Sequence, residues 1–297
     1  MSDLHRTPVI GVLGGSGLYE IEGLTDTQWT EVQSPWGAPS DSLFSGILNG
    51  VRIVFLPRHG RGHVYAPSDI NYRANIDILK RAGVTDAISL SAVGSFREAY
   101  EPGTFVIVDQ FIDRTFAREK SFFGEGLVAH VAMADPVCPR LGDALHAAAS
   151  AQGLKVVRNG TYLCMEGPQF STRAESELYR SWDCDVIGMT NMPEAKLARE
   201  AEICYATVAM VTDFDCWHPD HSDVEVTDIL KVLTQNAGNA RALVRDVAPA
   251  IAGARPTVCP HGCDRALDTA LITSPNARAG DRLVKLDAVA GRVLEEG

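Results

Sequence analysis

The sequence contains no long uncharged apolar run, so no segment predicts a transmembrane helix. Its first seven residues are polar and lack the apolar core of a secretory signal peptide. Because this signal is missing, we expect a cytoplasmic location.

Positive charge is scarce, since 27 Lys and Arg residues stand against 38 Asp and Glu and give a net charge of −11. This balance disfavours nucleic acids and anionic membranes as partners, because both attract basic surfaces. A small anionic substrate is still compatible with it, because a local cationic pocket can form in an acidic protein. We therefore expect small-molecule partners.

Cysteine is also scarce, with 7 residues, and the odd number argues against complete disulfide pairing. Cys164 and Cys204 lie within apolar runs, as reduced core thiols of a cytosolic enzyme do. Cys259 and Cys263 flank a Pro-His-Gly turn that could suit a metal or a disulfide. The chain offers no second close pair to complete a zinc site, so we predict free thiols and no metal. The motif at 218–221 has a metal-like spacing but the composition of an exposed loop.

Two nucleotide-binding signatures are absent. The glycine-rich turn Gly14-Gly15-Ser16-Gly17 has Glu20 where a dinucleotide fingerprint requires its third glycine, and no Walker A motif occurs. A turn of this kind still exposes backbone N–H groups and a hydroxyl that can bind an anion. Anion binding and a plain tight turn both remain open at this point.

Short apolar segments alternate with segments of helical periodicity, which predicts an α/β fold. We expect strands at 9–13, 52–56, 87–90, 105–108, 162–165, 186–188 and 203–211. We expect helices at 70–82, 138–152, 173–181, 193–201, 226–251 and 278–296. No linker or repeat divides the chain, so we predict one catalytic domain over 1–297, with about 252–297 as its C-terminal extension.

Polar or glycine-rich residues follow the buried strands. They are Ser16, Arg58, Ser91, Met189 with Thr190, and Asp213. Ligands of α/β sheets bind outside the carboxyl ends of the strands. These five clusters are therefore predicted to converge on one pocket.

The segment from Arg58 to His63 is the strongest basic cluster in this acidic chain. A guanidinium beside an imidazole suits a phosphate, which arginine can bind through two parallel hydrogen bonds. A solvated loop is the alternative. Since the cluster directly follows a buried strand, we favour phosphate binding.

Asp213 and Asp215 follow the most apolar strand. They could bind a metal, act as general acid and base, or accept hydrogen bonds from the edge of a base. A helix cap or an Asx turn is the structural alternative. No His-Glu pattern nearby supports a metal.

Six motifs in one order resemble the trimeric purine-nucleoside phosphorylase family, specifically its methylthioadenosine phosphorylase branch. They are Gly-Gly-Ser-Gly-Leu at 14–18, Arg-His-Gly at 58–60, Ser-Ala-Val-Gly-Ser at 91–95, Glu-Gly-Pro-Gln-Phe at 166–170, Gly-Met-Thr at 188–190 and Thr-Asp-Phe-Asp-Cys-Trp at 212–217. The resemblance covers roughly residues 9–250. It implies a central mixed, partly barrel-like sheet flanked by helices, and a homotrimer with active sites near the subunit interfaces.

The resemblance also implies roles for individual residues. The phosphate site would comprise Ser16, Arg58, His59, Ser91, Ala92 and Thr190. The ribose and base would contact Met189, Phe170 and Ser171, with Asp213 and Asp215 at the N7 and amine side of the purine. The 5′-methylthio group would meet Val226, Ile229 and Leu230, and also His130 from the neighbouring subunit. Ser16 and Ser91 stand where many family members have threonine, and the hydroxyl is kept.

The implied reaction is phosphorolysis of S-methyl-5′-thioadenosine to adenine and 5-methylthioribose 1-phosphate, with phosphate as co-substrate and no cofactor. Phosphorolysis of methylthioinosine or other 6-oxopurine nucleosides is the nearest alternative. An ionised Asp215 favours adenine, because it accepts from an amine and repels a 6-oxo group. A water-using nucleosidase and a regulatory nucleotide-binding domain are more distant alternatives, which phosphate-dependent release of the base would exclude.

Overall fold

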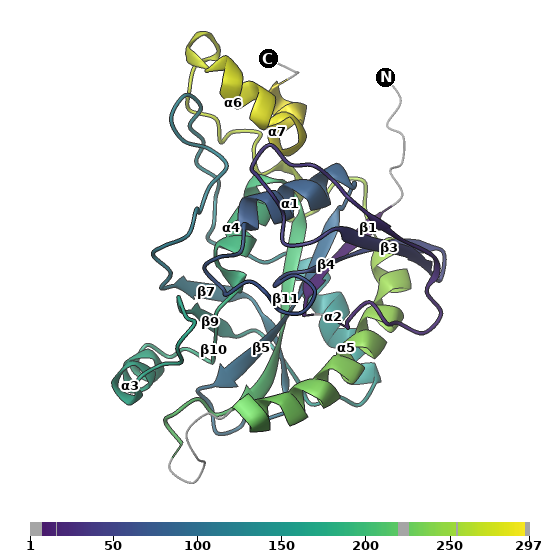
Figure 1. The fold of residues 1–297 in the computed structure, drawn as a ribbon, viewed down its shortest axis with the longest axis vertical. Coiled ribbons are helices and arrows are strands. Elements are labelled where there is room, and N and C mark those ends of the chain that lie inside the picture. The colour runs from purple at the N-terminus through teal and green to yellow at the C-terminus, as the bar shows by residue number, and fades with distance from the viewer. Residues whose placement is uncertain (1–7, 16, 219–225, 254, 295–297) are drawn as a thin grey trace.

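The computed structural model describes residues 8–15, 17–218, 226–253 and 255–294, with only the backbone of 226–230. Within these residues, eleven strands form one mixed sheet with helices on both faces (Figure 1). The hydrogen-bonded path runs from β2 at one edge to β7 at the other, and these two strands do not pair with each other, so the sheet does not close. This architecture confirms the expected α/β fold with a mixed, helix-flanked sheet.

Four parallel strands form the centre of the sheet in the order β4, β1, β5, β11. They are β1 (Val9–Gly14), β4 (Val51–Pro57), β5 (Asp86–Ser95) and β11 (Cys204–Asp213). Nearly all of their residues are buried, which explains why they form continuous apolar runs in the sequence. Since the strands are parallel, their carboxyl ends lie at one edge of the sheet.

The sheet forks at β5, which pairs with β1, β11 and β10 (Val186–Gly188). One branch continues from β10 to β9 (Thr161–Cys164) and β7 (Gln110–Asp113). The other continues from β11 to β6 (Phe105–Val108) and β8 (Val156–Arg158). The fork brings the end of β10 next to the ends of the parallel strands.

An antiparallel pair, β2 (Thr25–Thr30) and β3 (Leu43–Leu48), extends the sheet beyond β4. The sequence pattern did not predict these two strands, and it also missed β7 and β8. Every residue of β2 is exposed, so this strand lacks the apolar alternation that marks a half-buried strand. Its Trp29 packs on Phe44 of β3 with ring centroids 5.0 Å apart, a contact made only after the strands pair.

The main helices cover the two faces of the sheet. The core on one face includes α1 (Tyr72–Arg81) and α4 (Asn191–Glu200), and the core on the other includes α2 (Pro139–Ala151) and α5 (Val226–Gly253). Helix α3 (Arg173–Ser181) lies to one side of the sheet (Figure 1). All five helices were predicted, with ends within two residues of those observed.

Local sequence explains the backbone geometry at the beginning of two of these helices. Thr172 and Glu175 form a capping box at α3, in which each side chain accepts from the other residue's backbone N–H. In α4 the backbone leaves helical geometry at Met192 because Pro193 follows, and a residue before proline disfavours the α conformation. Regular helical geometry therefore continues from Pro193, the predicted start, although the element as a whole spans Asn191–Glu200.

The single terminal helix expected at 278–296 is two short helices, α6 (Gly280–Lys285) and α7 (Asp287–Leu294). The break falls at Leu286, which is completely buried. Two 3-10 turns, Cys263–Arg265 and Pro275–Ala277, occupy the preceding turn-rich segment. No helix in the described part of the chain has the length and hydrophobicity to cross a bilayer.

Candidate active site

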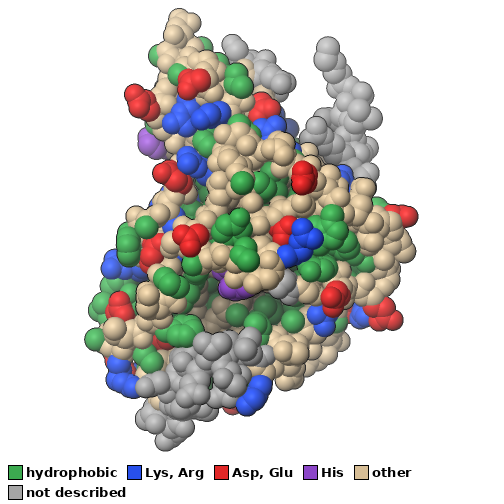
Figure 2. Space-filling view, in the orientation of Figure 1, with side chains coloured by type: hydrophobic (Ala, Val, Ile, Leu, Met, Phe, Trp, Pro, Cys, Tyr) green, Lys and Arg blue, Asp and Glu red, His purple; other side chains and the backbone are tan. Residues whose placement is uncertain are grey.

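A cavity of about 600 Å³ lies at the carboxyl edge of the central strands. Residues that end β4, β5, β10 and β11 line it, and Leu233 and Ala237 of α5 form part of its wall. Figure 2 shows a hollow on this face of the molecule, with histidine at its edge. Four of the five predicted strand-end clusters meet in this cavity.

The cavity brings together most of the predicted site residues. They are Arg58, His59, Ser91, Ala92, Phe170, Met189, Thr190, Asp213 and Asp215. Ser171 supports Asp215 through a hydrogen bond. Ser16, the side chains of Val226, Ile229 and Leu230, and residues 219–221 of the 218–221 motif lie outside the described residues.

His130 does not line the cavity of this chain. Its side chain is exposed, and its backbone N–H donates to the carbonyl of Ala270 at 2.9 Å. A contribution from His130 to a site would therefore have to be made to another subunit.

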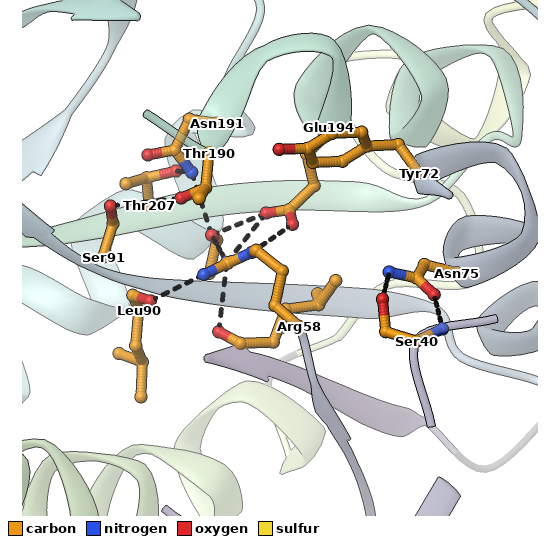
Figure 3. Close-up of polar contacts among 12 residues, drawn as sticks. Ser40, Arg58, Tyr72, Asn75, Leu90, Ser91, Thr190, Asn191, Glu194 and Thr207 are labelled. Atoms are coloured by element: carbon orange, nitrogen blue, oxygen red, sulfur yellow. Dashed lines mark hydrogen bonds and ion pairs between the residues drawn. The ribbon is translucent and has the colours of Figure 1, made fainter. Parts of the chain in front are cut away.

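Arg58 is buried in a dense polar network (Figure 3). Its Nε donates to Glu194 at 2.6 Å, and its Nη2 donates to Glu194 at 3.1 Å and to Ser89 at 2.5 Å. The carbonyl oxygens of Leu90 and Leu13 accept from Nη1 and Nη2. Burial lowers the pKa of Arg58, but the nearby carboxylate of Glu194 raises it by more, so the pKa of Arg58 lies above its ordinary value.

This network limits the donors that Arg58 could offer to a phosphate. Among the described residues, the partners of Arg58 leave one N–H of Nη1 for a ligand. Arg58 therefore supplies a fixed positive charge and a single donor at the cavity wall. Sequence reasoning missed Glu194, which lies 136 positions away from its partner and one turn after Thr190.

His59 is held in one orientation and one tautomer. Its Nδ1 lies 2.9 Å from the carbonyl oxygen of Tyr65, which only an N–H can serve, so Nε2 is the free acceptor of the neutral ring. Burial lowers the pKa of His59 to about 4, and its ring stacks on His63 with centroids 4.1 Å apart. At neutral pH His59 is thus an uncharged acceptor, suited to a protonated phosphate oxygen.

Two hydroxyl groups stand beside Arg58. The side-chain oxygens of Ser91 and Thr190 are 3.5 Å apart, and Ser91 also contacts the Tyr162 hydroxyl at 3.0 Å. Gly188 permits this arrangement, because a Cβ there would lie 1.9 Å from the Tyr162 oxygen. The hydroxyls and the Arg58 charge together suit an oxyanion.

Asp213 ends β11 and faces the cavity. Thr212 donates to Oδ2 at 2.7 Å, and the backbone N–H of Asp215 donates to Oδ1 at 2.8 Å. Gly94 leaves room for the carboxyl group, since a Cβ there would lie 2.9 Å from Oδ1. Burial raises the pKa of Asp213, against the effect of these hydrogen bonds. Asp213 therefore holds a proton more readily than an exposed aspartate does.

Asp215 occupies a turn with φ of 52°, in the left-handed region that aspartate and asparagine tolerate better than most residues. Its carboxylate accepts from the Ser171 hydroxyl at 3.2 Å. Burial raises the pKa of Asp215 as well. The two carboxyl groups thus share one wall of the cavity, as the sequence spacing allowed.

The rest of the wall is largely apolar. Phe170 is 46% exposed at its entrance, and Met189 lies deeper, with its carbonyl held by Arg118 at 2.6 Å. Sequence reasoning missed Arg118, whose buried guanidinium also donates to the Glu166 carbonyl at 2.6 Å. These bonds fix the loop after β9 to the loop after β10.

A buried charge with two hydroxyls suits an oxyanion, while paired carboxyl groups and an apolar wall suit a nitrogen heterocycle. Together with the forked α/β sheet, this combination defines the class of enzymes that cleave nucleosides with an anionic co-substrate. Residues 9–249 match the family model of the phosphorylase superfamily. The chain belongs to this superfamily and, within it, to the S-methyl-5′-thioadenosine phosphorylase family.

The relatives include the S-methyl-5′-thioadenosine phosphorylase of Cereibacter sphaeroides, 64% identical over 97% of this chain and 99% of that protein. The corresponding protein of Rhodospirillum rubrum is 63% identical over 99% of this chain and 100% of its own length. Among solved structures, a methylthioadenosine phosphorylase from an antarctic soil metagenomic library superposes with a TM-score of 0.89. It shares 46% identity and covers 96% of this chain and 99% of its own. Methylthioadenosine phosphorylase from Schistosoma mansoni in complex with adenine has a TM-score of 0.82 and 34% sequence identity. The match covers 89% of this chain and 98% of that chain.

Proposed function

We propose that this chain cleaves S-methyl-5′-thioadenosine with inorganic phosphate, releasing adenine and 5-methylthioribose 1-phosphate. One observation carries the proposal: a single cavity combines the Arg58 charge and two hydroxyls with two buried carboxyl groups. The named function of relatives more than 60% identical over almost the whole chain supports the same reaction. The neighbour with adenine bound supports an adenine-containing nucleoside over the methylthioinosine alternative.

Phosphate binds between the hydroxyls of Ser91 and Thr190 and the single free donor of Arg58. The backbone at Ala92 also lines this part of the cavity. His59 accepts the remaining phosphate proton through Nε2, because its Nδ1 is committed to Tyr65. Phosphate is thereby held by fixed donors, and one of its oxygens is free to attack C1′ of the ribose.

Asp213 assists departure of the base. The purine leaves poorly as an anion, and a proton delivered to N7 lets it leave as neutral adenine. The raised pKa of Asp213 makes its carboxyl group a suitable donor. As the C1′–N9 bond breaks, the ribose becomes cationic, and the bound phosphate stabilises it before the new C1′–O bond forms.

Asp215 selects the base in its ionised form, which the hydrogen bond from Ser171 favours against the effect of burial: this form accepts from the 6-amino group of adenine and repels a 6-oxo group. Replacing Asp215 with asparagine is expected to raise methylthioinosine turnover relative to methylthioadenosine by about tenfold or more, since the amide can donate to the 6-oxo group. Asparagine also tolerates the left-handed backbone at this position. The measurement is kcat/KM for both nucleosides at saturating phosphate.

Asp183→Asn is the matched control. Asp183 also has a left-handed backbone, with φ of 63°, but its side chain is 86% exposed. Its substitution should leave the ratio of the two substrates unchanged. An unchanged ratio in Asp215→Asn would contradict the role of Asp215 in base selection.

The 5′-methylthio group is expected to lie near α5, where the side chains of Leu233 and Ala237 already give the cavity an apolar wall. Burial of apolar surface favours a methylthio group over a 5′-hydroxyl. We assign Val226, Ile229 and Leu230 on the preceding turns of α5 to the same pocket. In a homotrimer, the exposed His130 of a neighbouring subunit would complete it. A cytoplasmic location and the absence of an organic cofactor belong to the same proposal.

A further inference from the structure

Four buried cysteines lie together on the α2 and α5 side of the sheet. Sγ atoms of Cys138, Cys204, Cys259 and Cys263 all lie within 4.8 Å of one another. None of the four lines the active-site cavity. In the sequence, only Cys259 and Cys263 form a close pair. In the fold, Cys138 at the start of α2 and Cys204 at the start of β11 lie beside them as a second pair. The zinc ligand set, which the sequence pattern left incomplete, is therefore complete in the fold.

The spacing of the sulfur atoms fits a tetrahedral metal site better than a disulfide. The Sγ atoms of Cys138 and Cys259 are 3.8 Å apart, far longer than the roughly 2.05 Å of a disulfide bond. Sulfurs bound to a tetrahedral zinc ion at about 2.3 Å are separated by about 3.8 Å. A polynuclear iron–sulfur cluster spreads its cysteines over several iron atoms and needs wider separations.

The backbone around the cluster is built to hold these positions. Cys259 and Cys263 flank a tight turn in which Gly262, with φ of 68°, donates its N–H to the Cys259 carbonyl at 2.9 Å. Asp264 accepts from the Cys259 N–H at 2.9 Å and so fixes the start of this turn. The N–H of Cys138 donates to the carbonyl of Tyr205 at 2.8 Å, which joins the start of α2 to β11.

The surroundings of the four cysteines largely exclude water. All four cysteines belong to an apolar core that includes Leu141, Val247 and Ile251. Two arginines close to the cluster in sequence, Arg140 and Arg255, both pair with the fully buried Asp86, and Arg255 also pairs with Asp264 at 3.5 Å. These two arginines and two aspartates form a neutral set beside the cluster, so the ligand geometry and the apolar enclosure carry the argument for a metal.

The geometry points to a structural zinc site in which Cys138, Cys204, Cys259 and Cys263 bind one Zn²⁺ as thiolates. Four protein ligands close the tetrahedron and leave no position for substrate, so the ion has no part in phosphorolysis. It links the segment after α5 to the beginnings of α2 and β11. The C-terminal part of the chain is thus anchored to the sheet by the metal as well as by packing.

Zinc content tests this proposal. The purified full-length wild type, passed through metal-free buffer, should contain about one zinc per chain by inductively coupled plasma mass spectrometry. The variant Cys259→Ser/Cys263→Ser should lose this zinc. Cys184→Ser is the matched control, because Cys184 is equally buried and lies outside the cluster. This control should keep the full zinc content.

A second measurement uses only the wild type, so that misfolding of a variant cannot decide the result. Protein produced in cobalt-supplemented medium should show the intense sulfur-to-cobalt charge-transfer absorption of a tetrahedral thiolate site. Titration with an organomercurial should release the native zinc in step with thiol modification. Wild type without zinc and without the cobalt spectrum, bound iron instead of zinc, or intact masses showing disulfides would each overturn the proposal. Methylthioadenosine turnover is scored separately, so failure here leaves the proposed reaction unaffected.

Discussion

Replacing Asp213 with alanine is expected to lower kcat for methylthioadenosine phosphorolysis by about 10²–10⁴-fold while KM for the nucleoside changes little. The reason is that Asp213 donates its proton in the transition state, when N7 becomes basic, and contributes less to binding the ground state. The raised pKa and the position at the cavity wall both support this role. Steady-state kinetics at saturating phosphate measure the effect.

The Asp213→Asn variant separates proton donation from shape. It keeps the size of the side chain but removes the acid, so kcat should fall nearly as far as in the alanine variant. In the wild type, kcat should decrease as pH rises through the raised pKa of Asp213, and this decrease should vanish in Asp213→Asn. A near-normal kcat in either variant would contradict the assignment.

The Asp213→Asn variant also separates the expected loss of kcat from a loss of stability, because its amide oxygen can still accept a hydrogen bond. The folded pKa of Asp213 lies above its unfolded value, so the carboxyl group favours folding when protonated and opposes it as the pH rises. Above that pKa the charge of Asp213 therefore does not stabilise the fold, and the expected cost of the alanine variant is the acceptor lost by Thr212 and by the Asp215 N–H, about 1–3 kcal/mol. Thermal unfolding of the variants at the assay pH checks this.

Replacing Glu194 with alanine is expected to lower the free energy of unfolding by about 3–5 kcal/mol, because it leaves Arg58 as an unpaired buried charge. The side chains of this ion pair are 3% and 1% exposed. The hydroxyls of Ser89 and Tyr205 also donate to Glu194 and would lose their acceptor. With Arg58 no longer held in place, KM for phosphate should rise more than KM for the nucleoside.

Asp287→Ala is the control for this second prediction. Asp287 pairs with Arg81 at the surface, where its side chain is 56% exposed, and such pairs contribute about 0–1 kcal/mol. Urea unfolding should show a much larger loss of unfolding free energy in Glu194→Ala than in Asp287→Ala. Only Glu194→Ala should raise KM for phosphate. Equal stability losses in both would contradict the view that Glu194 positions a buried Arg58.

The central strands of the sheet could be predicted from the sequence. Strands such as β1 and β11 are buried on both faces, and their uninterrupted apolar runs are visible without a structure. Strand β2 could not be found in this way, because all of its residues are exposed and it exists only by pairing with β3. The split terminal helix likewise depends on tertiary packing, since Leu286 is buried where the helix breaks.

The residues of the candidate site that follow strands could also be predicted from the sequence. The rule that ligands bind at strand carboxyl ends brought Arg58, Ser91 and Asp213 to one cavity, as the structure has them. Contacts between distant residues were not predictable. The pairing of Arg58 with Glu194 and the gathering of four cysteines both arise only when separate elements pack together.

Release of adenine from methylthioadenosine, followed with and without inorganic phosphate, tests the central claim most directly. The proposed function predicts rapid release that requires phosphate and yields equal amounts of adenine and 5-methylthioribose 1-phosphate. Release at the same rate in phosphate-free buffer, with free methylthioribose as the second product, would contradict it.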